Sequence, residues 1–503
     1  MMKEMPHWLS KQSEQNPDKI ALENENGNQW TFWEVEQESK RFARKLYQAG
    51  VRSGDHVGIF SGNEPQMIFV VYALSYLGAV GVLLNTKLTK AEIEYQIKDA
   101  EISMMVSNEA LSSYIKQLDS VPMHLSYSEL RNLTEGEVQL RDYIALTDVF
   151  TIMYTSGTTG APKGVMHTYE NHWWSAISSM LNVGLHKNDK WLCCLPMFHI
   201  SGLSIFLKSI IYGMPVLLFE KFNIKEVHAA IFDKGVTMIS VVTVMARRLL
   251  KELSESEAAS YPDYFRCMLL GGGIVPLSDL EKARTYHVPL YQSYGMTETS
   301  SQIVTLSPES IHSKIGSVGK PLLSASLRIV SADVEGIGEI EVKGPMVTKG
   351  YYNKIEATKN SFCDDWLKTG DMGYIDEDGF IYIVDRRSDL IISGGENIYP
   401  AEIEKALMGI TGIDAAGVCG VSDPNWGQRP VAFIETNHDN LSASEIKTTL
   451  QQMIANYKIP DRIFLVSKLP RNASNKLLRR TLKEWLEKKL ENACFKLEIK
   501  EID

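Results

Sequence analysis

Short apolar runs alternate with segments of helical periodicity through most of the first 385 residues. The runs predict strands at Phe150–Tyr154, Trp191–Leu195, Val216–Phe219, Met238–Val242, Cys267–Leu270 and Pro289–Gln292. Residues 169–183 are predicted to be helical, with one apolar face made of Trp173, Ile177, Met180 and Leu181. Alternation of strands and helices is typical of parallel α/β layers.

The pattern changes after about Gly338. GEIEVKG and GFIYIVDR are short alternating segments bounded by Gly and Asp, which is typical of antiparallel strands. The polar stretch DRRSD, residues 385–389, then precedes mixed strands and helices. We therefore predict an α/β fold in which residues 1–387 form a large N-terminal domain of doubly wound α/β subdomains plus a small antiparallel β section. Residues 388–503 are predicted to form a smaller α+β domain.

The charge and hydropathy of the chain argue against two kinds of partner. A net charge of -10 over 503 residues disfavours a general nucleic-acid binder, because phosphate binding needs clustered Lys and Arg. Met67–Leu84 carries no charge and is nearly long enough to cross a bilayer, yet Gly78 and Gly81 indicate a break within it. A buried helix that turns into a buried strand fits this segment, so we expect no stable membrane insertion.

The cysteines and the N-terminus favour a cytoplasmic protein. None of the six cysteines forms a C-x-x-C pair or stands near the His spacing of a zinc site. The first fifteen residues, MMKEMPHWLSKQSEQ, show no apolar run after the lysine, so no secretory signal is visible. Buried, reduced thiols are the expectation for such a chain.

Several predicted strands run into loops of unusual composition. Phe150–Tyr154 is followed by TSGTTGAPKG and Trp191–Leu195 by PMFHISG, while the last two strands lead into GGG and SYGMTE. In open α/β sheets, ligands bind beyond the carboxyl ends of the strands. We therefore expect these four loops to share one site.

The loop Thr155–Gly164 has the composition of a phosphate-binding loop. It places three glycines, four hydroxyls and Lys163 within ten residues. Glycines let backbone N–H groups point inward, and the hydroxyls and the lysine add donors and charge. It is not a Walker A loop, because Gly160 is followed by Ala-Pro-Lys-Gly. Gly271–Gly273 likewise lacks the last glycine of a dinucleotide-binding fingerprint.

With these motifs in their order, the chain resembles the superfamily of adenylate-forming acyl-CoA synthetases. The resemblance covers nearly the whole chain and is carried by TSGTTGAPKG at 155–164, YGMTE at 294–298, TGD at 369–371, Asp385-Arg386 and PRNASNK at 470–476. Such enzymes join a carboxylate to the α-phosphate of ATP and then transfer the acyl group to coenzyme A. The resemblance implies ATP and Mg²⁺ as cofactors, coenzyme A as co-substrate, and a small-molecule carboxylic acid as substrate.

The resemblance also assigns residues to the phosphates and the metal. Glu298 is implied as the carboxylate that binds Mg²⁺, with Thr155 or Thr297 touching the phosphates and Thr155 as a further metal ligand. Mg²⁺ prefers carboxylate and hydroxyl oxygens, which agrees with these residue types. The remaining phosphate-binding residues are implied to be Ser156, Gly157, Thr158, Thr159 and Lys163.

The nucleoside is assigned to a second group of motifs. Tyr294 is similar to the residue that stacks on adenine, next to the loop containing Gly272 and Gly273. Asp371 is implied to accept hydrogen bonds from the ribose hydroxyls, with Arg386 as a nearby cation. As an Asx cap in a TGD turn, Asp371 also has an ordinary structural interpretation.

Lys476 is our candidate for the catalytic residue of adenylation. By resemblance, a C-terminal loop brings this ammonium to the carboxylate and the α-phosphate, where it orients and neutralises both. The residue before it is Asn475 instead of the usual glycine, and Asp385 and Ser388 also depart from the superfamily pattern.

The resemblance further implies that the C-terminal domain is mobile. It is expected to rotate and present Ser393–Ile398, where Gly394 and Gly395 let the pantetheine arm of coenzyme A approach the backbone.

The acid is predicted from the loop after Trp191–Leu195. His199 matches a residue that lines the acyl pocket, and NHWWSA, FHISGLSI and SDLIISGGENIYPAEIE narrow the resemblance to ligases of an aromatic acid with a ketone and a second carboxylate. Such an acid needs apolar walls with hydrogen-bond donors, for which the candidates are His199, Ser201, Ser240, Thr243 and Ser293. A fatty or aryl acid–CoA ligase and a non-catalytic nucleotide-binding module are the alternatives. Association into a homodimer is left open.

Overall fold

The computed structural model describes residues 3–155, 161–258, 260–271, 277–311, 313–334, 336–385, 390–436, 442–470, 477–491 and 499–502. The chain divides into two compact units. The first unit comprises Met1–Thr86, Gln96–Tyr154 and Gly164–Val384, and the second comprises Lys87–Tyr95, Thr155–Lys163 and Asp385–Asp503. The predicted boundary between residues 387 and 388 lies outside the described residues.

One sheet collects the early strands of the chain. Its order is β10 (Lys163–Thr168), β9 (Val149–Thr155), β5 (Val80–Leu83), β4 (His56–Phe60), β6 (Met104–Ser107) and β7 (His124–Ser126). The described pairings from β9 to β7 are parallel, as the strand–helix alternation predicted.

The uncharged segment Met67–Leu84 is a helix followed by a strand. Helix α3 (Pro65–Leu77) ends at Gly78, whose φ of 70° in the left-handed region turns the chain into β5. Both elements are buried in the core, which confirms the prediction for this segment. Among the residues that the structure describes, no helix has the length and hydropathy needed to span a membrane.

A larger sheet follows, and its strands change from parallel to antiparallel. Its order is β18 (Ser326–Val330), β19 (Gly338–Lys343), β21 (Trp366–Ile375), β22 (Ile381–Asp385), β17 (Ser317–Pro321), β16 (Ser301–Leu306), β15 (Leu290–Met296), β14 (Cys267–Gly271), β13 (Met238–Val242), β11 (Trp191–Cys193), β12 (Val216–Leu218), β2 (Ile20–Asn24) and β3 (Gln29–Thr31). The short β20 (Phe362–Cys363) pairs with β21, and β1 (Glu4–Pro6) pairs with β8 (Tyr143–Ala145) elsewhere. The predicted antiparallel section after Gly338 is confirmed by β19 and β22.

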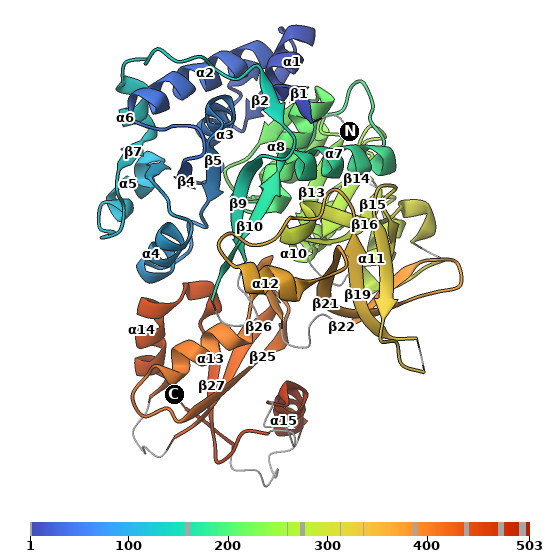
Figure 1. The fold of residues 1–503 in the computed structure, drawn as a ribbon. Helices are drawn as coiled ribbons and strands as arrows, with labels where there is room; N and C mark the ends of the chain where they lie inside the picture. Colours follow the sequence, from blue (N-terminus) through green and yellow to red (C-terminus); the bar gives the residue numbers. More distant parts are fainter. Residues whose placement is uncertain are drawn as a thin grey trace. The chain divides into compact units, whose positions relative to one another are not determined.

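Helices pack on both faces of the parallel strands of the larger sheet (Figure 1). One face packs with α1 (Trp8–Gln15), α7 (Tyr169–Val183) and α8 (Ile200–Tyr212), in a core shared with α2 (Phe32–Gln48) and α3. The other face packs with α9 (Ile224–Asp233), α10 (Thr243–Glu255) and α11 (Leu277–Thr285). The other described α-helices before residue 385 are α4 (Lys90–Asp99), α5 (Glu109–Ile115), α6 (Tyr127–Asn132) and α12 (Ile355–Ser361).

Helix α7 has the predicted bounds, but its buried face was predicted wrongly. Leu181 is 57% exposed, and Trp173 is only partly buried. Polar residues are buried instead, because they bond to neighbouring backbone: the Ser175 hydroxyl donates 2.7 Å to the Ser300 carbonyl, and the Asn171 amide donates 2.9 Å to the Val347 carbonyl. Periodicity of apolar residues alone does not reveal such a satisfied polar interface.

The second unit contains a smaller mixed sheet with helices. Its strand order is β24 (Glu396–Ile398), β23 (Ile391–Ser393), β26 (Gly427–Glu435), β27 (Arg462–Val466) and β28 (Ile499–Glu501), with β25 (Ala415–Asp423) also paired to β26. The helices are α13 (Pro400–Met408), α14 (Ala443–Met453) and α15 (Arg479–Glu491). Together with the first unit, these elements confirm the predicted α/β class with a smaller α+β C-terminal part.

Candidate active site

Parallel pairing places two of the four predicted loops along one edge of the larger sheet, whereas β9, which leads into TSGTTGAPKG, belongs to the other sheet. β11 pairs with β13, β13 with β14, and β14 with β15, all in parallel. The carboxyl ends of these strands therefore lie on the same side, followed by PMFHISG after β11, Thr243 after β13 and the SYGMTE segment at the end of β15. The first unit thus has a row of polar loop segments where α/β proteins bind ligands.

The turn carrying Glu298 follows β15 directly. Thr297–Thr299 form a 3₁₀ turn, and Glu298 is 5% exposed. The Tyr351 hydroxyl donates a hydrogen bond of 2.9 Å to Oε1 of Glu298, and the Thr348 N–H donates one of 2.8 Å to the Glu298 carbonyl. A fixed carboxylate is chemically suited to Mg²⁺, which also takes ligands from substrate phosphates.

Tyr294 and Asp371, far apart in sequence, are directly bonded. The Tyr294 hydroxyl donates a hydrogen bond of 2.8 Å to Oδ2 of Asp371. The Asp371 N–H in turn donates 3.1 Å to the Thr369 hydroxyl, so the turn that carries the carboxylate is held as well. The structure brings together two residues that the resemblance assigns to the nucleoside of ATP.

Gly295 keeps the YGMTE segment close to the next strand. It lies at a β-bulge between β15 and β16, where a Cβ would stand 2.1 Å from the carbonyl oxygen of Ser301. A side chain at this position would push β16 away and displace the turn that carries Glu298.

His199 stands immediately before α8, with its ring against Phe198 at a centroid distance of 4.8 Å. The preceding loop is held by Asn63, which is 5% exposed. Its amide donates 2.9 Å to the Leu195 carbonyl, and its Oδ1 accepts 2.8 Å from the Met197 N–H. Sequence reasoning missed Asn63, because a single asparagine before a helix has no distinctive signature. Ser201, in the first turn of α8, is exposed.

The other candidate hydroxyls differ in their bonding. The Ser240 hydroxyl accepts a hydrogen bond of 3.2 Å from the indole N–H of Trp191, and the Ser293 hydroxyl donates one of 3.0 Å to the Leu270 carbonyl. The buried hydroxyl of Thr243 has no hydrogen-bond partner within the described residues. Ser240 and Ser293 are thus already engaged, whereas Thr243 keeps an unused donor.

Sequence reasoning also missed Lys208, on α8. It is 2% exposed, and its Nζ lies 5.9 Å from the ring centroid of Trp191. In the part of the chain that the structure describes, no carboxylate is paired with it. Burial lowers the pKa of Lys208 from 10.5 to about 7, and Cys267 opposes this only partly. A single charge inside the apolar run LSIFLKSIIY was the signal that could have revealed it.

In the second unit, Gly394 and Gly395 form the tip of the β23–β24 hairpin. Both have positive φ, 59° and 88°, as the tight turn requires. A Cβ on Gly394 would stand 2.8 Å from the Trp426 ring, and the Gly394 N–H donates 2.8 Å to the Trp426 carbonyl. The glycines therefore keep the backbone bare beside a half-exposed tryptophan.

Part of the predicted site lies outside the described residues. Thr155 and Lys163 are the last residue of β9 and the first of β10. The predicted residues outside the described ranges are Ser156, Gly157, Thr158, Thr159, Gly272, Gly273, Arg386 and Lys476.

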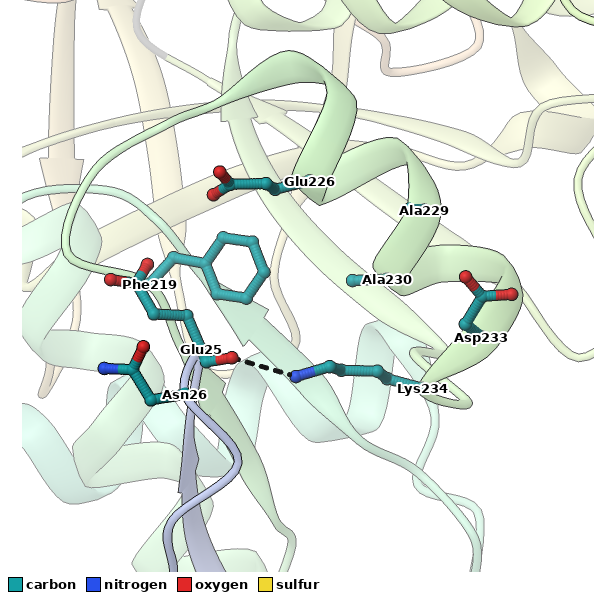
Figure 2. Close-up of a pocket in the computed structure, with 8 residues that line it drawn as sticks. All are labelled: Glu25, Asn26, Phe219, Glu226, Ala229, Ala230, Asp233 and Lys234. Carbon is teal, nitrogen blue, oxygen red and sulfur yellow. Dashed lines mark hydrogen bonds between the residues drawn. The ribbon is translucent and has the colours of Figure 1, made fainter.

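A separate surface pocket lies between the β2–β3 turn and α9 (Figure 2). Lys234 on its wall donates 3.3 Å to the Glu25 carbonyl, as Figure 2 shows. None of the predicted site residues lines this pocket, whose walls are Glu25, Asn26, Phe219, Glu226, Ala229, Ala230, Asp233 and Lys234.

Comparison with known protein families shows the family to which the chain belongs. Residues 9–352 match the AMP-binding enzyme family, and residues 402–476 match the AMP-binding enzyme C-terminal domain. The chain belongs to the AMP-binding enzymes. This confirms the superfamily predicted from the series of motifs.

Relatives that are 44% identical or more carry names for one ligase. A 2-succinylbenzoate–CoA ligase of Oceanobacillus iheyensis is 53% identical, and the match covers 96% of this chain and 100% of the relative. A double mutant of o-succinylbenzoate CoA synthetase from Bacillus subtilis, bound with its product analogue OSB-NCoA, is 44% identical with a TM-score of 0.91, over 96% of this chain and 98% of that one. The same Bacillus subtilis enzyme in complex with ATP and magnesium ion is 45% identical with a TM-score of 0.75, over 95% and 100%.

Proposed function

We propose that this AMP-binding enzyme converts 2-succinylbenzoate, ATP and coenzyme A to 2-succinylbenzoyl-CoA, AMP and diphosphate, a step of menaquinone biosynthesis. The relatives named above support the reaction, and the three segments that narrowed the sequence prediction resemble the same ligases. ATP and coenzyme A are cytoplasmic metabolites, so we place the enzyme in the cytoplasm.

The buried Lys208 is the observation on this chain that carries the choice of acid. Once one carboxylate of 2-succinylbenzoate is activated, a second carboxylate remains on the ring. A buried ammonium is strongly destabilised unless an opposite charge compensates it. A fatty acid brings no such charge, whereas the ring carboxylate does, and the adjacent Trp191 offers an aromatic wall. We therefore assign the ring carboxylate to Lys208 and the acyl pocket to the face of α8 that follows His199.

In the first half-reaction, a carboxylate oxygen attacks the α-phosphorus and diphosphate leaves. Lys476 orients the two reacting groups, and Asp371, aligned by Tyr294, holds the ribose hydroxyls. Glu298 would hold Mg²⁺, and the ion would supply positive charge to the phosphates. By resemblance to the superfamily, we assign Thr155, Ser156, Gly157, Thr158, Thr159 and Lys163 to the phosphates, and Gly272, Gly273 and Arg386 to the nucleoside.

In the second half-reaction, the thiol of coenzyme A attacks the acyl carbonyl, AMP leaves and the thiol proton passes to solvent. Gly394 and Gly395 give the pantetheine arm access to bare backbone. The two steps use different faces of residues 388–503, so we assign these residues to a mobile cap and residues 1–387 to the adenylation domain.

A panel of acids tests the proposal. 2-Succinylbenzoate, benzoate, a keto acid without the ring carboxylate and a medium-chain fatty acid are each incubated with ATP, Mg²⁺ and coenzyme A, and thioester is measured by mass. We expect 2-succinylbenzoate to react fastest. Lys208→Met should raise its KM and leave the KM of ATP unchanged, while the exposed Lys225→Met serves as control. Preferential reaction of the fatty acid would refute the assignment of the acid.

A further inference from the structure

Residues 347–352 join the strand after the phosphate loop to the turn that carries Glu298. Tyr351 forms an antiparallel bridge with Val165 of β10. The Met166 N–H donates 3.1 Å to the Gly350 carbonyl, and the Tyr352 N–H donates 2.8 Å to the Gly164 carbonyl. This short segment is thus hydrogen-bonded along the beginning of β10.

The same segment contacts Glu298 at two points. The Tyr351 hydroxyl donates to Oε1 at 2.9 Å, and the Thr348 N–H donates to the carbonyl at 2.8 Å. Both partners of the first bond are buried, with Tyr351 8% and Glu298 5% exposed. A hydrogen bond between buried groups holds a side chain in one direction far better than an exposed one does.

β10 reaches the turn directly as well. His167 Nε2 lies 2.7 Å from the Thr297 carbonyl, which can only accept, so the ring donates. His167 is fully buried. The backbone of the turn is therefore fixed by His167 and Thr348, and Tyr351 bonds directly to the Glu298 carboxylate.

The geometry points to Tyr351 as a positioning residue for the metal-binding carboxylate of Glu298. This inference rests on the proposed function, in which Glu298 binds Mg²⁺. Glutamate has three rotatable bonds, and removing the phenol takes a hydrogen bond of 2.9 Å from its Oε1. Partners that orient a metal ligand typically contribute about tenfold to hundredfold in metal affinity.

Tyr352 offers a matched control one residue away. Its hydroxyl also donates to a carboxylate, Oε2 of Glu101, at 2.7 Å, but on the exposed surface. Tyr352→Phe removes the same kind of bond from the adjacent position and keeps the backbone N–H that bonds to Gly164. An effect that appears in Tyr351→Phe and not in Tyr352→Phe therefore does not come from the loss of a phenol in this segment as such.

Calorimetric titration of ATP at graded Mg²⁺ concentrations, without acid or coenzyme A, tests the inference. The measured quantity is the Mg²⁺ concentration that gives half of the full increase in ATP affinity. We expect the same value for the wild-type protein and for Tyr352→Phe. In Tyr351→Phe this concentration should rise by about tenfold or more. The rate of diphosphate release should show the same shift and recover at high Mg²⁺, which a general loss of structure would not allow.

Glu298→Gln and the double variant Tyr351→Phe/Glu298→Gln separate the outcomes. Glu298→Gln should shift the Mg²⁺ dependence at least as far, and adding Tyr351→Phe to it should change nothing more. If the Mg²⁺ dependence shifts in Glu298→Gln but not in Tyr351→Phe, or if the two shifts add in the double variant, the role of Tyr351 is overturned and the metal assignment of Glu298 stands. No shift in Glu298→Gln would overturn the metal assignment of Glu298, and the role of Tyr351 with it. Thermal unfolding shows whether Tyr351→Phe retains its fold. All variants are then compared at one temperature, at which each of them is folded.

Discussion

Replacing Lys208 with methionine should stabilise the protein in the absence of substrate, by an amount that depends on pH. Burial lowers the pKa of Lys208 from 10.5 to about 7. Because one pH unit of difference between the folded and unfolded pKa corresponds to about 1.4 kcal/mol, keeping the ammonium charged in the fold costs roughly 5 kcal/mol. A protein that binds no anion at this position carries this destabilisation throughout the acidic range.

The direction with pH follows from proton binding. The unfolded chain keeps the proton on Lys208 up to about pH 10.5, whereas the folded protein releases it above about 7. The wild-type protein therefore gains stability as the pH rises through this window. Methionine binds no proton, so Lys208→Met should raise the free energy of unfolding by roughly 5 kcal/mol at pH 6 and only about 2 kcal/mol at pH 9.

Urea unfolding at pH 6 and pH 9 measures this difference, with Lys225→Met as the exposed control. The neighbours of Lys208 do not obscure it: burial raises the pKa of Cys267 to about 12 and places the pKa of His172 well below 6.5. 2-Succinylbenzoate should stabilise the wild-type protein and have little effect on Lys208→Met. A stabilisation independent of pH, or a Lys208→Met protein less stable at pH 6, would refute the burial of a chargeable, unpaired lysine.

Three further changes address separate steps. Lys476→Ala should lower the rate of diphosphate release about a hundredfold to a thousandfold, and an undiminished rate would contradict its role in adenylation. Gly394→Ala should slow thioester formation while leaving acyl-adenylate formation intact, because the added Cβ meets Trp426 at 2.8 Å. Single-turnover kinetics measure the two steps separately, and equal losses in both would argue against a thiol-specific role. Asn63→Ala should raise the KM of the acid more than that of ATP, since it frees the loop before His199 from two hydrogen bonds. Steady-state kinetics with each substrate varied in turn measure both values, and a larger rise in the KM of ATP would contradict this role.

Local sequence patterns predicted the fold well where the determining interactions are local. Gly78 breaks the uncharged run from Met67 to Leu84 because a glycine readily takes the left-handed conformation that ends α3. The predicted strand Met238–Val242 has the bounds of β13, since a continuous apolar run suits a strand buried on both faces. The buried face of α7 was wrong, because polar side chains such as Ser175 are satisfied by backbone groups from distant segments.

The sequence by itself determined the reaction class of this AMP-binding enzyme, because a phosphate-binding loop, the YGMTE segment and a C-terminal lysine loop keep a fixed order along the chain. Only the tertiary structure decided which side chains are paired and which are isolated. The bond between Tyr351 and Glu298 spans 53 positions, and the isolation of Lys208 depends on which strands lie beneath α8. Strand order brings such residues together, and no local pattern encodes the distance between two residues that meet only after the sheet has formed.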